Sequence, residues 1–451
     1  MRYDVAVIGT GQAAVPLAEK LVAAGRTVLL AERSRVGGTC VNYGCTPTKT
    51  LVASARAAHV ARTAGRLGVH AGEVAVDFAA VMARVAALVR RWREGVERRI
   101  AGAGPKLHLV RGHARFTGPR ALEVAGERHE ADVVVLNVGT RPSPPSLPGA
   151  EQVPWLDNGR ALELTSLPAH LVVLGGGYIG CELGQAFRRL GARVTIVQRG
   201  PHLLDREDPE ISEAIEGVFR AEGIELLLGA SAKRAAPRAG GAVVAVDDGR
   251  EVAGSHLLVA LGRRPNTDDL GCAEAGVALD ARGSVQVDDR YRTTAPGVYA
   301  VGDVNGGPQF THTSWDDHRL LFEVLEGRPG RGRAGRVVPY CVFTDPQVGS
   351  VGLNEREARA QAIPYRAATM PFGSIARAIE TDEPAGMMKL LAAPDGSRIL
   401  GATIAGAEGG ELVHVFAALI SAGTPVRALV EMQVAHPTYA EGLQSLAMRL
   451  G

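Results

Sequence analysis

Cysteine, aromatic residues and net charge are all scarce in this chain. Five of its 451 residues are cysteine, aromatic residues make up 4%, and 50 lysines and arginines against 48 aspartates and glutamates leave a net charge of +2. Five cysteines are too few for a disulfide scaffold at this length. A charge so close to zero provides no general field to attract nucleic acid or an anionic membrane. The composition therefore argues against a disulfide-rich secreted protein and against a nucleic-acid-binding one.

Long apolar runs are also absent. No run reaches the length needed to span a bilayer, and the first residues, MRYDVAVIGTGQ, lack the basic, apolar and small-residue order of a secretory signal. A hydrophobic content of 46% and a charged content of 22% are ordinary for a globular protein. The chain is too long for one core. We therefore expect a cytoplasmic enzyme of several domains with no membrane partner.

The first informative stretch is YDVAVIGTGQAAVPLAEKLVAAGRTVLLAER, which starts at residue 3. An apolar strand is followed by Gly9, Gly11 and Ala14 in the spacing G-x-G-x-x-A, then by a helical period and a second strand that ends in Glu32. Gly9 permits a tight turn, and Gly11 lets the backbone approach a pyrophosphate at the start of a helix. Glu32 can accept hydrogen bonds from a ribose. The stretch predicts a βαβ dinucleotide-binding unit rather than a glycine-rich turn without a ligand.

The same pattern recurs in HLVVLGGGYIGCELGQAFRRLGARVTIVQRG, where Gly175, Gly177 and Gly180 fit G-x-G-x-x-G. Gln198 lies as far from the first glycine of this copy as Glu32 does in the first copy. The duplication predicts two bound dinucleotides.

The second copy differs at the residue that contacts the ribose. Gln198 replaces the acid, and Arg199 follows it. A carboxylate there would bind a 2′-hydroxyl but repel a 2′-phosphate, whereas a neutral residue followed by arginine tolerates or attracts the phosphate. We therefore expect NADPH, with NADH less favoured. The alternative is that Arg199 is only a solvated loop residue.

Other residues are candidates for contact with a dinucleotide. Asp303 ends the strand in TTAPGVYAVGDV, and ligands bind at the carboxyl ends of parallel strands. It is a candidate for holding a flavin ribityl chain. The remaining cofactor-binding candidates are Gly38, Thr39, Gly139 and Gly262.

Two of the five cysteines lie close together in GGTCVNYGCTPTK, at Cys40 and Cys45. A zinc site is disfavoured because such sites need a second pair or histidines; two buried packing residues are the other alternative. A redox disulfide explains more, because the segment 39–54 reads as the start of a helix, and a helix N-terminus stabilises a thiolate. Lys49 lies one turn beyond Cys45 and can present a cation on the same side. We expect no metal, and the remaining cysteines are interpreted as packing residues, namely Cys181, Cys272 and Cys341.

With these motifs the sequence resembles the flavin-dependent pyridine nucleotide–disulfide oxidoreductases, which include glutathione reductase, dihydrolipoamide dehydrogenase and mercuric reductase. The shared motifs are the two glycine motifs, GGTCVNYGCTPTK, GVYAVGD and HPTYAE, and the resemblance covers essentially the whole chain. It implies an α/β, glutathione reductase-like fold with two Rossmann-like dinucleotide-binding domains and an α+β C-terminal dimerisation domain. It also implies FAD at the first unit, NADPH or NADH at the second, and a homodimer whose active site is shared between subunits.

The resemblance also implies roles for individual residues. Cys45 matches the cysteine beside the flavin that forms a charge-transfer thiolate, and Cys40 matches the interchange cysteine that attacks the substrate. Lys49 and Glu182 match an ion pair near the flavin. Tyr178 matches an aromatic lid over the nicotinamide pocket.

The motif HPTYAE completes the implied active site. His436 matches an acid–base residue contributed by the other subunit, and Glu441 the carboxylate that orients it. The chemistry agrees with this assignment, because releasing a thiol from a disulfide needs a proton and imidazole titrates near neutral pH. Without Glu441 and the cysteine pair, His436 would be interpreted as a structural residue before Pro437.

The branch of the family is less well determined. The segments CVFTDPQVGSVGLNE, REDPE and HTSWDDHRLL look most like mercuric reductases. That family carries a C-terminal pair of adjacent cysteines, but this chain has no cysteine after Cys341, and it has His436 where tyrosine is common. The predicted acceptor is a small-molecule disulfide or a thiophilic metal such as Hg(II). The alternatives are a low-molecular-weight thiol-disulfide reductase, a dihydrolipoamide dehydrogenase-like enzyme and, more remotely, a redox sensor that does not turn over.

The motifs suggest four segments in chain order. We expect the FAD domain at 1–148 and again at 265–333, the nicotinamide nucleotide domain at 149–264, and the interface domain at 334–451. The basic, glycine-rich run 326–336 is more typical of a solvated linker than of a nucleic-acid site.

Overall fold

The computed structural model describes residues 1–450, which divide into two compact units. Unit 1 consists of residues 1–47, 83–143 and 262–336. Unit 2 consists of residues 48–82, 144–261 and 337–451. Each unit contains one dinucleotide motif, and each is described by itself.

Unit 1 is built on a sheet in the order β3-β2-β1-β6-β5-β4, with β17 paired to the other edge of β6. The strands β3, β2, β1, β6 and β17 are parallel, and β5 and β4 are antiparallel additions. The strands are β1 (Arg2–Ile8), β2 (Val28–Glu32), β3 (Leu107–Arg111), β4 (Ala114–Gly118), β5 (Ala121–Val124), β6 (Glu127–Leu136) and β17 (Val298–Ala300). A short ribbon adds β7 (Thr140–Pro142) and β16 (Arg263–Pro265).

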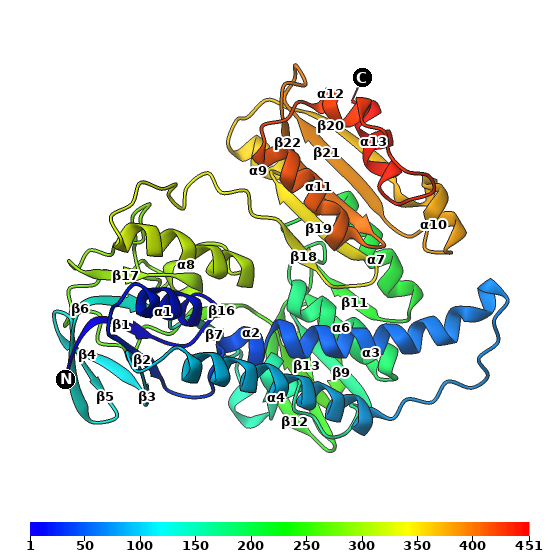
Figure 1. Ribbon diagram of the computed structural model, residues 1–451. Coiled ribbons are helices and arrows are strands. Elements are labelled where there is room, and N and C mark those ends of the chain that lie inside the picture. Colours follow the sequence, from blue (N-terminus) through cyan, green and yellow to red (C-terminus); the bar gives the residue numbers. More distant parts are fainter. Residues whose placement is uncertain (451) are drawn as a thin grey trace. The chain divides into compact units, whose positions relative to one another are not determined.

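The parallel strands of unit 1 are buried on both faces. Leu30 and Val135 flank Val7 in register, and these side chains pack with α1 (Ala14–Ala23) and α8 (Thr311–Leu325) on one face. Leu29 and Val134 belong to the cluster on the other face. Continuous apolar strands of this kind are typical of a parallel sheet covered on both sides. The carboxyl ends of the parallel strands therefore lie on the same side of the sheet. The glycine motif lies on that side, between β1 and α1 (Figure 1).

Unit 2 repeats this plan. Its parallel sheet has the order β11-β10-β9-β15-β8. The order of its first four strands corresponds to β3-β2-β1-β6, so the predicted duplication is confirmed in the topology. The elements are β8 (Trp155–Leu156), α5 (Asn158–Ala161), β9 (His170–Leu174), α6 (Tyr178–Leu190), β10 (Arg193–Gln198), α7 (Pro209–Ala221), β11 (Glu225–Leu228) and β15 (His256–Val259). An antiparallel sheet is inserted, with β12 (Ala232–Arg238), β13 (Gly241–Val246) and β14 (Glu251–Gly254).

The C-terminal part of unit 2 is an antiparallel sheet in the order β18-β19-β22-β21-β20. Helix α11 packs on β19 and β22, and Phe372, Met388, Phe416 and Leu443 are fully buried in the cluster between helices and sheet. The strands are β18 (Tyr340–Val342), β19 (Gln347–Gly352), β20 (Arg366–Pro371), β21 (Met387–Ala392) and β22 (Ile399–Gly406), and the helices are α9 (Glu355–Ala360), α10 (Ala376–Glu380), α11 (Gly409–Ser421), α12 (Val426–Glu431) and α13 (Glu441–Met448). The predicted fold class is confirmed.

The segment around the two cysteines differs from the single helix that we predicted. It forms two helices, α2 (Gly38–Asn42) and α3 (Cys45–Thr63), and a long helix α4 (Phe78–Gly102) follows later in the chain. Tyr43 ends α2 and leaves the helical conformation, with a φ of −142°. A Cβ at Gly44 would lie 3.0 Å from the carbonyl oxygen of Thr39, so the backbone turns tightly there. Cys40 therefore lies within α2, and Cys45 is the first residue of α3.

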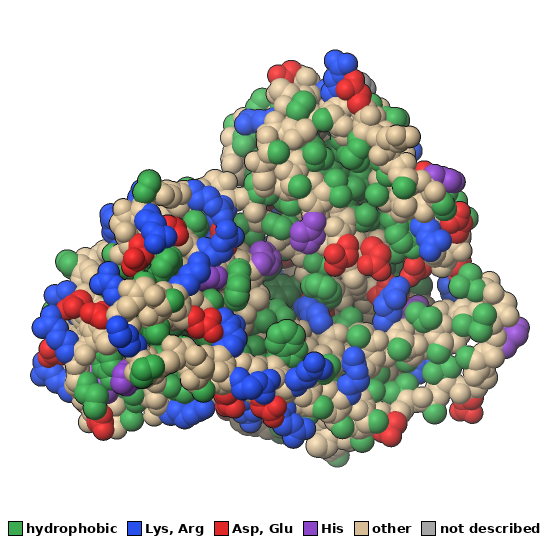
Figure 2. Space-filling model, viewed as in Figure 1, with side chains coloured by type: hydrophobic (Ala, Val, Ile, Leu, Met, Phe, Trp, Pro, Cys, Tyr) green, Lys and Arg blue, Asp and Glu red, His purple; other side chains and the backbone are tan. Residues whose placement is uncertain are grey.

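Surface charge agrees with the balanced composition. On the face shown in Figure 2, lysine and arginine side chains are interspersed with aspartate and glutamate. Within residues 1–450, no helix combines the length and the apolar character needed to cross a membrane.

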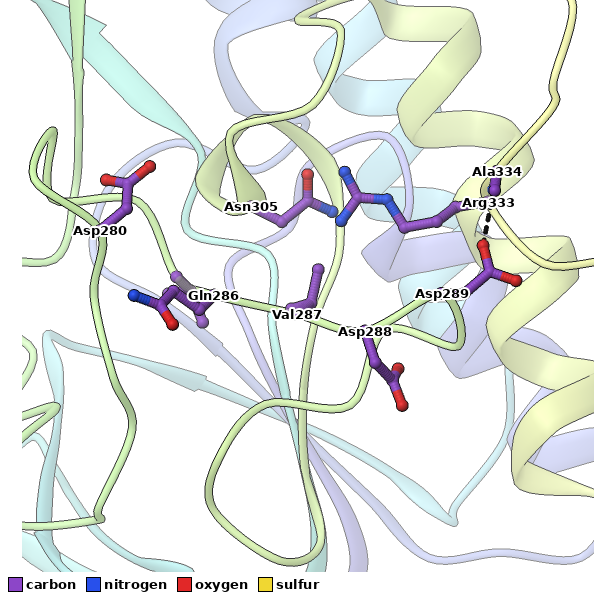
Figure 3. A pocket seen from close by; sticks show the side chains of 9 residues that line it. Asp280, Gln286, Val287, Asp288, Asp289, Asn305, Arg333 and Ala334 are labelled. Carbon is purple, nitrogen blue, oxygen red and sulfur yellow. Dashed lines mark hydrogen bonds between the residues drawn. The ribbon is translucent and has the colours of Figure 1, made fainter.

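Most of the basic run 326–336 is exposed, and two of its arginines pair with acidic residues of unit 1. Arg336 pairs with Asp317 at 2.7 Å, and Arg331 pairs with Asp316 at 2.8 Å. Arg333 extends toward Asn305 along an open hollow. The backbone amide of Ala334 donates a hydrogen bond to Asp289 (Figure 3). The ion pairs of Arg331 and Arg336 attach this segment to unit 1. None of the predicted site residues lines the hollow.

Candidate functional site

The first glycine turn leaves no room for side chains. Gly9 has a φ of +95°, and a Cβ there would lie 2.4 Å from the carbonyl oxygen of Asn137. A Cβ at Gly11 would lie 2.7 Å from Oδ1 of the same asparagine. That Oδ1 atom is buried, with no hydrogen-bond partner within residues 1–450. The turn is therefore an open backbone cradle at the start of α1, where free N–H groups favour an anion.

Glu32 closes the cradle from the end of β2. Its side chain is buried, and Oε2 accepts hydrogen bonds from the amide of Thr10 at 3.0 Å and from its hydroxyl at 2.6 Å. Oε1 accepts from the amide of Ser34 at 2.8 Å. These bonds hold the carboxylate in a fixed orientation, and a carboxylate has lone pairs left for the hydroxyl donors of a ribose.

Asp303 lies three residues beyond β17, in a short 3-10 helix (Gly302–Asn305) rather than at the end of the strand as predicted. Burial raises its pKa, against the opposing effects of Arg263 and of a hydrogen bond from Thr140. The Thr140 hydroxyl donates to Oδ2 at 3.1 Å. Two held carboxylates and a glycine cradle on one sheet edge fit the hydroxyl and phosphate groups of a flavin dinucleotide. Ala14 begins α1, and Gly139 has a φ of +64° with open space beside it.

The cysteine loop is fastened to this cradle. Gly38 has a φ of +62°, and a Cβ there would lie 2.9 Å from the Cα of Gly11. The amide of Gly37 donates to the hydroxyl of Thr10 at 3.2 Å, and the side chain of Gln12 donates to the carbonyl of Gly37 at 3.3 Å. The loop that contains the cysteines therefore contacts the dinucleotide turn through backbone atoms.

A buried asparagine braces the same loop from within. Nδ2 of Asn42 donates to the carbonyls of Val36 and Gly38 at 2.9 and 3.0 Å. Its Oδ1 accepts from Nε of Arg93 on α4 at 2.9 Å. These bonds hold α2, and with it Cys40, in one conformation.

The side chains of Cys40 and Cys45 lie within hydrogen-bonding reach of each other. The bond to Cys45, then burial, then the charge of Cys45 raise the pKa of the Cys40 thiol well above its usual range, whereas a hydrogen bond to Thr311 acts in the opposite direction. The Thr311 hydroxyl also lies 3.3 Å from Sγ of Cys45. Thr311, the first residue of α8, therefore contacts both sulfurs, and sequence reasoning had missed it.

The second glycine turn, in unit 2, has one position that packing does not explain. A Cβ at Gly175 would lie 2.5 Å from the carbonyl oxygen of Ala260, and one at Gly180 would lie 2.0 Å from the carbonyl oxygen of Gly175. At Gly177 a Cβ would meet no atom within 4 Å, and its φ of −76° is open to any residue. Glycine at 177 is thus suited to the approach of a ligand, as at the second glycine of a dinucleotide turn. In unit 1, Gly262 also has open space beside it, with a φ of +118°.

Gln198 takes over the backbone contact that Glu32 makes in unit 1. Its Oε1 accepts from the amide of Gly176 at 2.9 Å, and its side chain is buried. Its Nε2 lies 3.5 Å from a carboxylate oxygen of Asp205, a residue that the sequence reasoning did not consider. Arg199 is exposed.

Lys49 and Glu182 form the predicted ion pair within unit 2. Lys49 Nζ donates to Glu182 Oε2 at 2.6 Å, and the amide of Phe343 donates to Oε1 at 2.9 Å. The lysine Nζ also lies 4.6 Å from the centre of the Phe343 ring. The Glu182 side chain is 2% exposed, so both of its oxygens are satisfied in a buried setting. Tyr178, the predicted lid, begins α6 and is 43% exposed.

The histidine and glutamate of HPTYAE contact each other as predicted. Nδ1 of His436 lies 2.9 Å from Oε1 of Glu441, and the amide of Thr438 donates to Oε2 at 3.0 Å. The bond from Thr438 and then the contact with His436 lower the pKa of Glu441. His436 itself is exposed, so its outer nitrogen is open to solvent or to another chain.

Comparison with known families shows a match along nearly the whole chain. The model of the pyridine nucleotide-disulphide oxidoreductases matches residues 3–317, and the model of the dimerisation domain of the same proteins matches residues 338–447.

Individual relatives are similar over the same length. A mercuric reductase of Lysinibacillus sphaericus is 34% identical over 99% of this chain and 82% of that enzyme. A dihydrolipoyl dehydrogenase of Thermus scotoductus is 34% identical over 99% of this chain and 97% of that enzyme. A solved structure of the HOCl-induced flavoprotein disulfide reductase RclA from Escherichia coli matches with a TM-score of 0.90 at 32% identity, over 99% of both chains. That protein has also been solved as a Cu(II) complex.

Proposed function

This chain belongs to the pyridine nucleotide–disulfide oxidoreductase family and is a flavoprotein enzyme, and from that premise we propose that it passes electrons from NADPH through FAD to Cys40 and Cys45 and on to a small disulfide or a thiophilic metal ion. The observation that carries the proposal is the cysteine loop fastened to the first glycine turn, with Gly38 against Gly11 and the amide of Gly37 on Thr10. A dithiol held against a dinucleotide cradle is suited to exchange electrons with the bound cofactor.

FAD would be held by the residues of the unit 1 cradle. Its pyrophosphate fits at Gly9 and Gly11, and its hydroxyl groups are suited to Glu32 and Asp303. When bound, FAD accepts a hydride from the nicotinamide and supplies two electrons to a disulfide. Thr39 and Gly139 are proposed to complete its surroundings.

The nicotinamide nucleotide is proposed to bind at Gly175, Gly177 and Gly180, with Tyr178 over its ring. Gln198 supports NADPH because it holds the glycine turn without a charge, and the exposed Arg199 can reach a 2′-phosphate. Asp205 adds a carboxylate beside Gln198 that opposes the phosphate. We therefore propose a preference for NADPH that leaves NADH as a slower donor. A higher kcat/KM for NADH would contradict it.

The two cysteines reduce the substrate by thiol–disulfide exchange. The partner's His436 takes the proton of the Cys40 thiol, and the Cys40 thiolate attacks one sulfur of a substrate disulfide R–S–S–R, which forms a mixed disulfide and releases R–S⁻. The released R–S⁻ then takes that proton back from the imidazolium. The Cys45 thiolate then attacks the Cys40 sulfur, which re-forms the Cys40–Cys45 disulfide and releases the second thiolate. Glu441 orients the imidazole for the proton transfer.

The Cys40 assignment has support in its surroundings. The hydrogen bond to Cys45, burial and the charge of Cys45 raise the pKa of Cys40, so its thiol needs a base to form the attacking thiolate, which is the role proposed for the partner's His436. Thr311 can donate to either sulfur as the charge moves between them.

A thiophilic metal is the second proposed acceptor. Two adjacent soft sulfurs favour such ions, and several relatives are mercuric reductases. The His436–Glu441 pair favours a disulfide instead, because a metal ion requires no proton donor for a leaving thiol. A low-molecular-weight thiol-disulfide reductase is thus the alternative that the proton donor supports best.

One panel of acceptors tests the proposal. The FAD-loaded protein would be assayed for NADPH oxidation with glutathione disulfide, other thiol disulfides, lipoamide, Hg(II), a quinone and O₂. We expect turnover with a disulfide or Hg(II) that is lost in Cys40→Ser. Activity with O₂ alone would contradict the proposal and favour a redox sensor.

We also propose how the protein assembles and where its domains begin and end. The dimerisation domain supports a homodimer, in which each active site combines the cysteines of one subunit with the partner's His436. We also propose that the FAD domain comprises 1–148 and 265–333, the nicotinamide nucleotide domain 149–264 and the interface domain 334–451.

A further inference from the structure

The loop at residues 199–208, between β10 and α7, directly supports the second glycine turn. The amide of Leu204 donates to the carbonyl of Gly176 at 2.8 Å. The side chain of Leu203 packs so closely that a Cβ at Gly176 would lie 2.6 Å from it. The amide of Leu203 in turn donates to Glu216 of α7 at 3.0 Å. Any movement of this loop would therefore move the backbone that is proposed to receive the nucleotide.

The far side of the loop is held by residues of the dimerisation domain, within the same unit. Arg356 donates to the carbonyl of Asp205 at 2.5 Å and to that of Arg206 at 2.8 Å. Nδ2 of Asn354 also donates to the carbonyl of Arg206, at 2.7 Å. These hydrogen bonds hold the carbonyl oxygens of the two residues that follow Leu204, so they fix the position of the loop.

The end of the loop is anchored by a buried lysine. Lys389 of β21 is 2% exposed, and its ammonium lies 2.8 Å from Asp208 and 2.6 Å from Glu355, and also contacts Glu210. Burial lowers the pKa of Lys389, but its hydrogen bonds to Asp208, Glu210 and Glu355 outweigh that effect and leave the pKa raised. The lysine stays charged, so Asp208 is held by a permanent ion pair.

One more contact lies between these two points. The hydroxyl of Tyr340 on β18 donates to Oε1 of Glu207 at 2.5 Å, and Glu207 is buried. Four consecutive residues, from Asp205 to Asp208, are thus bound by side chains of the dimerisation domain.

We propose that Tyr340, Asn354, Arg356 and Lys389 are positioning residues for the pyridine nucleotide: they hold the 199–208 loop, which we call the nucleotide loop, against the glycine turn. The proposal rests on the proposed function, because it assumes that unit 2 binds the nucleotide at Gly175–Gly180. It goes further by assigning part of the nucleotide affinity to residues that touch no nucleotide and lie in another domain. The dimerisation domain then contributes to electron entry as well as to assembly.

Arg356 is the residue with which to separate positioning from folding. Its side chain is exposed and both of its bonds go to loop carbonyls, so Arg356→Ala removes the grip and creates no cavity. Arg427 is a matched control, because it is an exposed arginine of the same domain whose side chain pairs with Glu431 on its own helix. Arg356→Lys retains the charge but has a single donor nitrogen in place of the two that bond the loop carbonyls.

The test uses FAD-loaded protein and stopped-flow reduction of the flavin by NADPH without oxygen, which requires no electron acceptor. We expect Arg356→Ala to raise the apparent Kd for NADPH about 5-fold, which is the loss of two hydrogen bonds from a charged group discounted for solvent exposure. The limiting rate of flavin reduction should stay unchanged, Arg356→Lys should recover part of the affinity, and Arg427→Ala should match the wild type. Tyr340→Phe should raise the apparent Kd in the same way.

Two results would overturn the proposal. One is an apparent Kd within about 1.5-fold of wild type in both Arg356→Ala and Tyr340→Phe. The other is an equal rise in Arg427→Ala, which would indicate general destabilisation. Failure of the proposed function has a different signature, because then neither NADPH nor NADH would reduce the flavin of the wild-type protein.

Discussion

Glu207 gives the protein a pH-dependent stability that a single substitution should remove. Burial is the largest effect on this carboxyl group and raises its pKa from the usual 4.5 to about 7, against the hydrogen bond from Tyr340. Its Oε2 has no hydrogen-bond partner within residues 1–450. The folded protein therefore prefers the neutral acid at pH values where the unfolded chain is ionised.

The sign and size follow from proton linkage. Below pH 4.5 both states bind the proton, and the favourable contribution of the neutral acid is complete. As the pH rises from 4.5 to 7 the unfolded chain loses its proton first, so the contribution is lost. The difference between the two pKa values corresponds to about 3 kcal/mol between pH 4.5 and pH 8.

Glu207→Gln should remove this dependence, because glutamine cannot ionise and its carbonyl can still accept from Tyr340. The Tm of Glu207→Gln minus that of wild type, measured with FAD bound, should increase by about 3 °C from pH 5 to pH 8. Comparing this difference across pH cancels any constant cost of burying the amide. Glu213→Gln, an exposed position on the following helix α7, is the control and should follow wild type. A Tm difference that is flat or falls with pH would refute the reasoning.

Further predictions concern the redox groups. Thr311→Val removes the hydroxyl that contacts both sulfurs, so iodoacetamide should alkylate Cys40 more slowly at a fixed alkaline pH; an unchanged rate would contradict this role. Glu182→Ala leaves the Lys49 ammonium without its buried partner and should destabilise the protein by about 3 kcal/mol, measured by chemical denaturation and compared with the exposed-pair variant Glu431→Ala. Glu441→Gln should slow disulfide reduction at least about 10-fold while leaving the rate of flavin reduction by NADPH unchanged; equal slowing of both rates would argue against a role in proton transfer.

The sequence predicts those parts of the site that depend on residues close together in the chain. A tight turn before a helix requires glycine wherever a Cβ would collide with the chain. Gly9 and Gly175 can therefore be recognised in the sequence by their spacing from neighbouring glycines. His436 and Glu441 lie five residues apart, so their contact can also be predicted locally. The break between α2 and α3 was missed because it depends on the tight turn at Gly44, within a segment whose composition is helical.

The contacts that the sequence could not predict join distant segments. Thr311 contacts Cys45 across 266 positions, and Arg356 contacts Arg206 across 150. Nothing in the neighbourhood of either residue indicates its partner. Such pairs are created by the packing of sheets and helices, and only a structure reveals them.

The central claim is that Cys40 and Cys45 cycle between disulfide and dithiol at the expense of a nicotinamide nucleotide. The most direct measurement counts alkylated thiols by mass spectrometry before and after anaerobic reduction of the air-oxidised, FAD-loaded protein with NADPH. We predict that NADPH raises the count by two per chain, and that the new labels lie on Cys40 and Cys45. An unchanged count, with the flavin fully reduced, would contradict the account.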